Sequence, residues 1–127
     1  MGHDYAVLAA EAQRLAPSAR VVGSSCCGVV GKEGVSESMH DVAIMAVRGA
    51  DDIAVASVDD IYGANSRTKT MALAEQLKAV NPDITMVLFL ASGIDIDDDE
   101  CIAGFEAVLG PDVTVFGARS ADNMKGI

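Results

Sequence analysis

Apolar residues recur at helical spacing in three stretches of the chain, Tyr5–Ala16, about Thr68–Val80 and about Asp98–Leu109. Proline or glycine follows each stretch and would stop a helix there. The sequence therefore predicts three helices, each with one apolar face. The expected faces are Tyr5, Leu8, Ala12 and Leu15; then Leu73, Leu77 and Val80, with Met71 and Ala74 beside them; then Ile102, Phe105 and Leu109.

Short runs rich in valine and isoleucine lie between these helices and are typical of strands. The predicted strands are Ala19–Val22, Val42–Val47, Ile53–Val58, Ile84–Leu90 and Val113–Phe116, with a further short one at Val29 and Val30. The turn-like segment Arg48–Asp52 favours a hairpin between two of them. Ile84–Leu90 is continuously apolar, which is typical of a strand buried on both faces.

The order of these elements predicts an α/β fold with a mixed, largely parallel sheet flanked by helices. The second half alternates strands and helices, so we expect a right-handed parallel unit there. The length of 127 residues allows one domain. A doubly wound domain usually opens with a strand, whereas this chain opens with a helix. We therefore expect residues 1–127 to be a single but incomplete α/β domain.

The net charge and the number and spacing of the cysteines indicate which partners and which cellular location to expect. The net charge of −10 leaves no basic stripe for phosphates, which excludes nucleic acid and anionic membrane surfaces as expected partners. No apolar run approaches the roughly 20 residues of a membrane span, and the first residues lack a secretory signal pattern. Two of the three cysteines are adjacent and no C-x-x-C occurs. We expect a soluble, cytoplasmic protein with reduced thiols and no structural zinc.

Two loops rich in small residues follow predicted strands, where open parallel sheets bind ligands. The candidate ligand-binding residues are Gly23, Ser24, Ser25, Cys26 and Gly28 in the first loop, and Gly117, Arg119, Asp122 and Asn123 in the second. Arg119 could bind a carboxylate in bidentate fashion and Asp122 could accept from an amine, which suits an amino acid. The alternative is that the glycines only permit turns and the charged pair is solvated.

Both loops resemble motifs of a known family. The segment Val21–Gly28 resembles the "viG-CST-aGE" signature of the FIST N-terminal domain, a prokaryotic, bacterial sensory domain. The segment Val113–Asn123 resembles the family's later "vvGG-A-x-DN" motif, and the strands between them fall in the family's order. The chain departs from the motifs at Val29, where an acid often stands, and at Ala118, which replaces a glycine.

This resemblance implies a non-catalytic sensory domain that binds a small ligand, with amino acids as the proposed class. It implies signalling output partners such as kinases, cyclic-nucleotide enzymes or chemoreceptor modules. The family domain is longer at both ends, which agrees with an incomplete domain. Some members of the family look haem-dependent, so a gas sensor with His40 as haem ligand is an alternative; otherwise no cofactor is expected.

Two sharper chemistries and one role without a ligand are alternatives to a sensory domain. An enzyme using Cys26 or Cys27 as nucleophile needs a base, and the chain has only His3 and His40. Asp95, Asp97, Asp99 and Glu106 imitate a calcium loop, but Glu100 stands where that loop needs glycine, so we interpret these acids as a helix cap. A structural or interaction domain without a ligand is the third alternative, and an exposed edge strand could support a homodimer.

Overall fold

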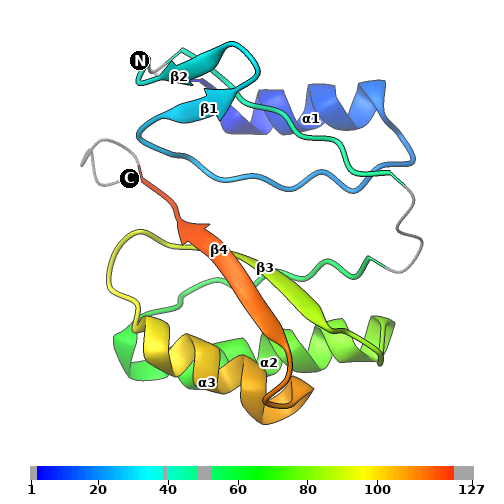
Figure 1. Ribbon diagram of the computed structural model, residues 1–127, viewed down its shortest axis with the longest axis vertical. Helices are drawn as coiled ribbons and strands as arrows, with labels where there is room; N and C mark the ends of the chain where they lie inside the picture. The colour runs from blue at the N-terminus through cyan, green and yellow to red at the C-terminus, as the bar shows by residue number, and fades with distance from the viewer. Residues whose placement is uncertain (1–2, 39, 49–52, 122–127) are drawn as a thin grey trace. The chain divides into compact units, whose positions relative to one another are not determined.

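The computed structural model describes residues 3–38, 40–48 and 53–121. The chain folds into two compact units (Figure 1). The first comprises the described residues of Met1–Arg48 together with Ala121, and the second comprises those of Gly49–Ser120. The first unit contains α1 (Tyr5–Leu15), β1 (Val29–Gly31) and β2 (Gly34–Ser36). The second contains the short 3-10 turn η1 (Gly63–Asn65), α2 (Ser66–Val80), β3 (Met86–Ala91), α3 (Asp98–Leu109) and β4 (Thr114–Arg119).

The first unit consists of a capped helix and a small hairpin. The Asp4 side chain accepts from the Val7 N–H at 3.1 Å, so α1 begins where the sequence predicts it. Strands β1 and β2 are antiparallel, with Val30 opposite Val35. The predicted apolar face of α1 is not buried: Tyr5 and Leu15 are exposed, while Leu8 and Ala12 are half-buried.

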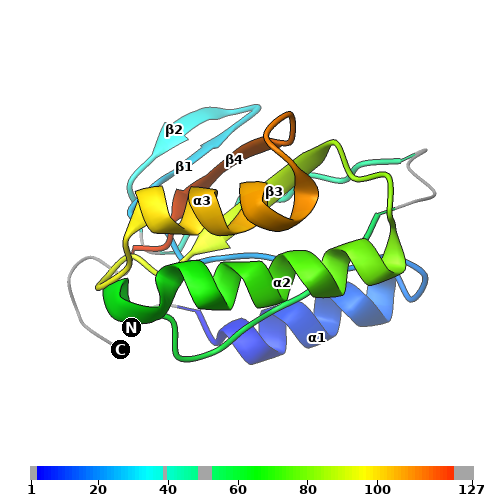
Figure 2. The ribbon, with the colours of Figure 1, turned by 90° about the horizontal axis from the view of Figure 1, so that it is seen from below.

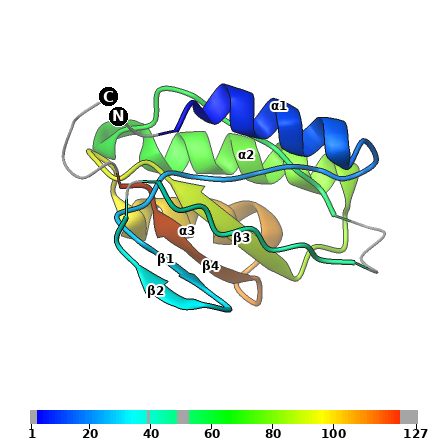
Figure 3. The same ribbon diagram turned by 90° about the horizontal axis from the view of Figure 1, so that it is seen from above.

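The second unit is a parallel strand pair with two helices on one face. Val87 of β3 lies opposite Val115 of β4 in the ladder. The helices α2 and α3 run side by side (Figure 2) and lie on the same side of β3 and β4 (Figures 1 and 3). The core between these layers contains Leu73, Ala74, Val87 and Phe105. The rings of Phe89 and Phe105 meet edge to face, with centroids 5.2 Å apart.

The α/β class is confirmed, and so are the three helices and the last two predicted strands within a few residues. The sheet is divided, however, into one antiparallel and one parallel pair of strands. No helix among residues 3–38, 40–48 and 53–121 is both long and apolar enough to cross a membrane. That residues 1–127 form a single domain stays a prediction.

Three predicted strands are wrong, because Ala19–Val22, Val42–Val47 and Ile53–Val58 have no strand assignment. Ile53–Val58 still alternates exposed and half-buried residues, and Ala56 and Val58 pack against the core. This segment therefore has the period of a strand but not the hydrogen-bonded ladder that defines one. The predicted turn between the second and third of these segments falls largely on residues 49–52, which lie outside the described residues.

The prediction that Ile84–Leu90 is buried on both faces is also wrong. Val87 and Ala91 are buried, whereas Met86, Leu88 and Leu90 on the opposite face are exposed. The physical reason is the position of the helices, since α2 and α3 both cover the same face. A run of apolar residues shows that both faces can be buried but does not show what covers them.

Candidate functional site

The carboxyl ends of β3 and β4 meet at one edge of the second unit. The ladder ends with Ala91 opposite Arg119, and the Ser120 N–H donates to the Ala91 carbonyl oxygen at 2.8 Å. Ligands of open parallel sheets bind at such an edge, outside the carboxyl ends of the strands. The loop that follows β3 is therefore a candidate site on topology alone.

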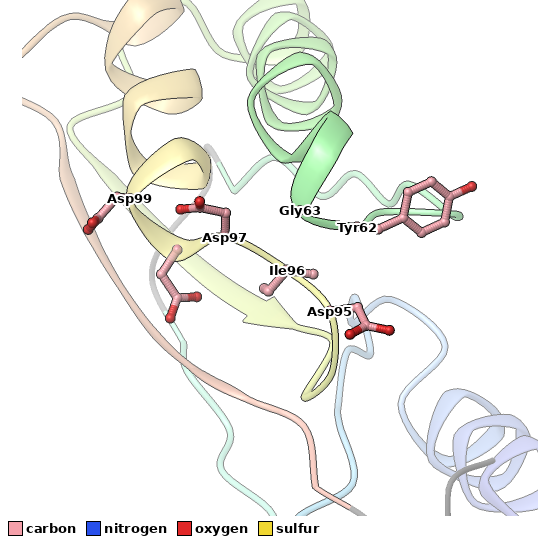
Figure 4. Close-up of a pocket in the computed structure, with 7 residues that line it drawn as sticks. Tyr62, Gly63, Asp95, Ile96, Asp97 and Asp99 are labelled. Atoms are coloured by element: carbon pink, nitrogen blue, oxygen red, sulfur yellow. The ribbon is translucent and has the colours of Figure 1, made fainter.

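An open hollow of about 780 Å³ lies at this edge (Figure 4). It is formed where the loop after β3 and the first turn of α3 face the turn before α2. Its lining residues are Tyr62, Gly63, Asp95, Ile96, Asp97, Asp98 and Asp99. Four carboxylates line this hollow, and their negative charge attracts cationic groups.

Hydrogen bonds through Ser66 hold the two sides of this hollow together. The Ser66 hydroxyl donates to the Tyr62 carbonyl oxygen at 2.9 Å and accepts from the Asp97 N–H at 3.0 Å. Ser66 is fully buried at the start of α2. A single hydroxyl thus links the segment before α2 to the residue that precedes α3.

The acids of the hollow also begin α3. The Asp97 side chain accepts from the Glu100 N–H at 3.1 Å, and Asp98, Asp99 and Glu100 form the first turn. Negative charge at a helix N-terminus is stabilised by the helix dipole. Asp95 has a positive φ of 58°, and its carbonyl oxygen accepts from the Gly63 N–H. The prediction that these acids cap a helix is confirmed for Asp97.

Arg119 brings a positive charge to the edge of the hollow. Its Nε donates to both carboxylate oxygens of Asp98 at 3.1 Å, and its Nη2 lies 2.8 Å from Asp98 Oδ2. The same Nη2 donates to the Ile96 carbonyl oxygen at 2.9 Å. A ligand carboxylate bound by Arg119 would have to share the guanidinium with Asp98.

The carboxylates of Asp95, Asp97 and Asp99 do not converge on one point, and the Tyr62 ring points away from them (Figure 4). Within the part of the chain that the structure describes, no group of three or more His, Cys, Asp or Glu could hold a metal ion. The arrangement instead offers separate acceptors to a ligand that is larger than an ion.

None of the residues that line the hollow was among the ligand-binding residues predicted from the sequence. The signal was present, since Asp95 and Asp97 follow the most apolar strand, at the end where ligands bind. Their helix-capping pattern accounts for them equally well, so the sequence alone gives no reason to assign them a second role. Tyr62 and Gly63 come from a segment more than 30 residues away, and only the fold brings them to this edge.

Two residues of the second predicted loop lie in a strand, which corrects that part of the prediction. Strand β4 continues through Arg119, so Gly117 and Arg119 belong to it. Gly117 has a φ of +156°, and a Cβ there would collide with the Phe89 carbonyl group. Gly117 therefore has a structural reason to be glycine. Asp122 and Asn123 lie outside the described residues.

The first predicted loop lies in the first unit, where Gly23, Ser24, Cys26 and Gly28 are exposed and Ser25 is half-buried. The Ser25 carbonyl oxygen accepts from the Ala121 N–H at 3.1 Å. The first loop thus contacts one residue of the second. That these loops bind a ligand stays a prediction.

The two histidines lie near one another in the first unit. His3 Nε2 is 2.8 Å from the His40 carbonyl oxygen, and the two rings meet edge to face with centroids 6.3 Å apart. The His3 ring nitrogen is therefore paired with the backbone rather than with a thiol. Haem ligation by His40 stays a prediction.

The sequence matches the model of a known protein family. The model of the family described as FIST N domain matches residues 1–126, which is nearly the whole chain. Neither a curated protein nor a solved structure matches. The resemblance first noted at Val21–Gly28 and Val113–Asn123 therefore extends across both units.

Proposed function

The chain belongs to the FIST N domain family, a family of sensory domains associated with signal transduction, and we propose that it senses a small ligand bearing an amino group. The observation that carries the proposal is the acidic hollow at the carboxyl ends of β3 and β4. A sensory role needs binding rather than turnover, and membership of a sensory family is consistent with a protein that is not an enzyme.

The charges around the hollow favour a zwitterion such as an amino acid. The carboxylates of Asp95, Asp97 and Asp99 can accept from an ammonium group. Arg119 reaches the same edge through Asp98 and can donate to a carboxylate. A ligand with both groups would replace part of the Arg119–Asp98 pairing with its own carboxylate.

Such an exchange supplies a means of signalling. Arg119 ends β4 and Asp98 begins α3, so the ion pair joins a strand end to a helix start. A ligand changes the population of two states only if it binds them with different affinity. Breaking the Arg119–Asp98 pair on binding would provide that difference. The change would then pass to a signalling output partner.

A separate proposal is that the first loop binds a ligand. Its residues are Gly23, Ser24, Ser25, Cys26 and Gly28. These residues are exposed except for the half-buried Ser25, and their backbone N–H groups and hydroxyls suit a polar ligand. Exchanging Ser24 and Ser25 for alanine tests this loop independently of the hollow.

The test is a thermal-shift screen of the whole chain against free amino acids and small amines. A ligand at 100 times its Kd should stabilise the folded state by about 2.7 kcal/mol and raise Tm accordingly. The double variant Asp95→Asn, Asp97→Asn removes two charges but keeps residues that tolerate a positive φ and that cap helices. It should lose the ligand-dependent rise.

The matched control is Asp83→Asn, which removes an exposed acid outside the hollow. This variant should keep the full rise in Tm. The proposal fails if no compound in the screen raises Tm, or if the double variant responds as strongly as the control. A rise with haem alone, lost in His40→Ala, would favour the gas-sensor alternative.

A further inference from the structure

Cys26 and Cys27 are adjacent in the chain, and both are free and exposed in the first unit. They lie between the segment that ends at Ser25 and the start of β1 at Val29. Two accessible thiols on neighbouring residues are an uncommon surface feature, because cysteine is among the most often buried residue types. The arrangement therefore calls for a chemical interpretation.

The backbone on each side of this pair has tertiary contacts. The Ser25 carbonyl oxygen accepts from the Ala121 N–H at 3.1 Å. On the other side, Gly28 lies close to the end of β2, where an added Cβ would be 3.0 Å from the Ser36 carbonyl oxygen. The two cysteines thus lie in a short segment that has a backbone hydrogen bond on one side and a close backbone approach on the other.

A disulfide within the pair is disfavoured by geometry. Consecutive Cα atoms are about 3.8 Å apart, whereas disulfides usually join Cα atoms about 4.4–6.8 Å apart. A bridging atom relaxes this constraint, because it enlarges the ring that the two side chains close and lets the sulfurs lie further apart than a disulfide bond length of about 2.05 Å. The pair is better suited to hold a third atom than to bond directly.

The number of protein ligands at the pair limits which atom can bridge the two sulfurs. Structural zinc requires four protein ligands, and the described residues contain no group of three or more His, Cys, Asp or Glu able to hold a metal. Thiolates prefer soft acceptors. We propose that Cys26 and Cys27 form a two-thiol site for a soft acceptor with two exchangeable positions, of which a monosubstituted trivalent arsenical is the matching class.

The proposed reaction with phenylarsine oxide involves no oxidation or reduction. Two As–S bonds form, one to each cysteine, and both bonds of the As=O group break. The two thiol protons leave with the oxygen as one molecule of water. Arsenic remains trivalent, so no further reactant is required.

Cys101 provides an internal control. Its side chain is 1% exposed, and burial raises the pKa of its thiol, which lowers the fraction of reactive thiolate. The folded chain should therefore react with iodoacetamide at two thiols and the unfolded chain at three.

The experiment is intact-mass analysis of the folded chain after one equivalent of phenylarsine oxide, followed by an excess of a monothiol. Binding through two linked thiols should resist the competitor, because the second bond forms intramolecularly and linkage strengthens binding by about 10²–10⁴-fold. Wild type and Cys101→Ser should keep the adduct, and a dithiol should remove it. Cys26→Ser and Cys27→Ser should each lose retention by about 100-fold or more.

Circular dichroism spectra of the four proteins establish that they share one fold. Two results would overturn the proposal. The first is removal of the arsenical from wild type by the monothiol, which means attachment through one thiol only. The second is retention in either single variant at the wild-type level.

Discussion

Gly104 decides how closely the two helices of the second unit approach. An added Cβ at this position would lie 2.7 Å from the Arg67 carbonyl oxygen and would collide with the Thr70 side chain. Thr70 is fully buried, and its hydroxyl donates to the Ser66 carbonyl oxygen at 2.9 Å. The absence of a side chain at Gly104 thus permits the contact between α2 and α3.

Gly104→Ala should destabilise the protein although alanine is the better helix former. Crowding of a packed interface typically costs about 1–3 kcal/mol, which exceeds the gain of roughly 1 kcal/mol in helix propensity. Urea unfolding measures the difference. Gly23→Ala is the control, because nothing lies within 4 Å of a Cβ there; equal stability of the two variants would contradict the packing argument.

Burial raises the pKa of the Cys101 thiol above its ordinary value of 9.0, and the Asp98 and Asp97 carboxylates act in the same direction. A hydrogen bond with Ser66 and the charge of Arg119 oppose the rise in part. The folded chain therefore keeps this proton at a pH where the unfolded chain loses it. The stabilisation is fully present below about pH 9 and is lost as the pH rises through the folded-state pKa.

The free energy of unfolding should accordingly fall as the pH rises above the ordinary thiol value of 9.0, and the fall should be smaller in Cys101→Ala. Urea titrations of both proteins across this range give the comparison. Other groups titrate in both proteins equally, so only the difference between the two slopes is diagnostic. Parallel slopes would show that the thiol ionises alike in both states.

At the scale of elements, the start of α3 combines two roles. Asp97 caps the helix through the Glu100 N–H and also lines the acidic hollow. The capping role needs a hydrogen-bond acceptor, whereas binding an ammonium group needs a charge. Substitutions can therefore separate the two.

Asp97→Ala should lower stability by about 1 kcal/mol, the usual cost of losing an N-cap. Asp97→Asn should keep nearly all of the stability, because asparagine caps as well as aspartate. Thermal or urea unfolding tests both. A loss of the same size in Asp97→Asn would show that the charge, and not the cap, stabilises this helix.

At the scale of the whole molecule, the segments with a strand-like apolar pattern are not all segments that form hydrogen-bonded ladders. Val42–Val47 and Ile53–Val58 have strand-like sequences but no strand assignment. One face of the β3–β4 pair is apolar and exposed. Its residues are Met86, Leu88, Leu90 and Phe116. Among the described residues, only the parallel pair with α2 and α3 has both a ladder and a core.

Backbone amide exchange should follow the ladders. Val87 in β3 and Phe105 in α3 should exchange slowly, because their exchange requires opening of the core. Amides of Val42–Val47 and Ile53–Val58 should exchange much faster. Hydrogen-exchange mass spectrometry resolves these segments, and equal protection in all four would mean that the predicted strands are hydrogen-bonded in one larger sheet.

The helices were predictable because their signals are local. Asp4 and Asp97 are caps that can be identified from a few neighbouring residues, and Gly110 and Pro111 stop α3 without reference to the rest of the chain. The acidic hollow was not predictable. Tyr62 and Asp95 are far apart in sequence, and their proximity depends on how the segments before α2 and α3 join through Ser66.

The sequence by itself determined the α/β class, the three helices, the parallel pair of the second half and the family, since periodicity, caps and motifs are properties of neighbouring residues. Tertiary structure alone decided which extended segments form ladders, which face of β3 the helices cover and that Arg119 meets Asp98. These depend on partners distant in the chain, and hydrogen bonding and burial are settled only when such partners come together.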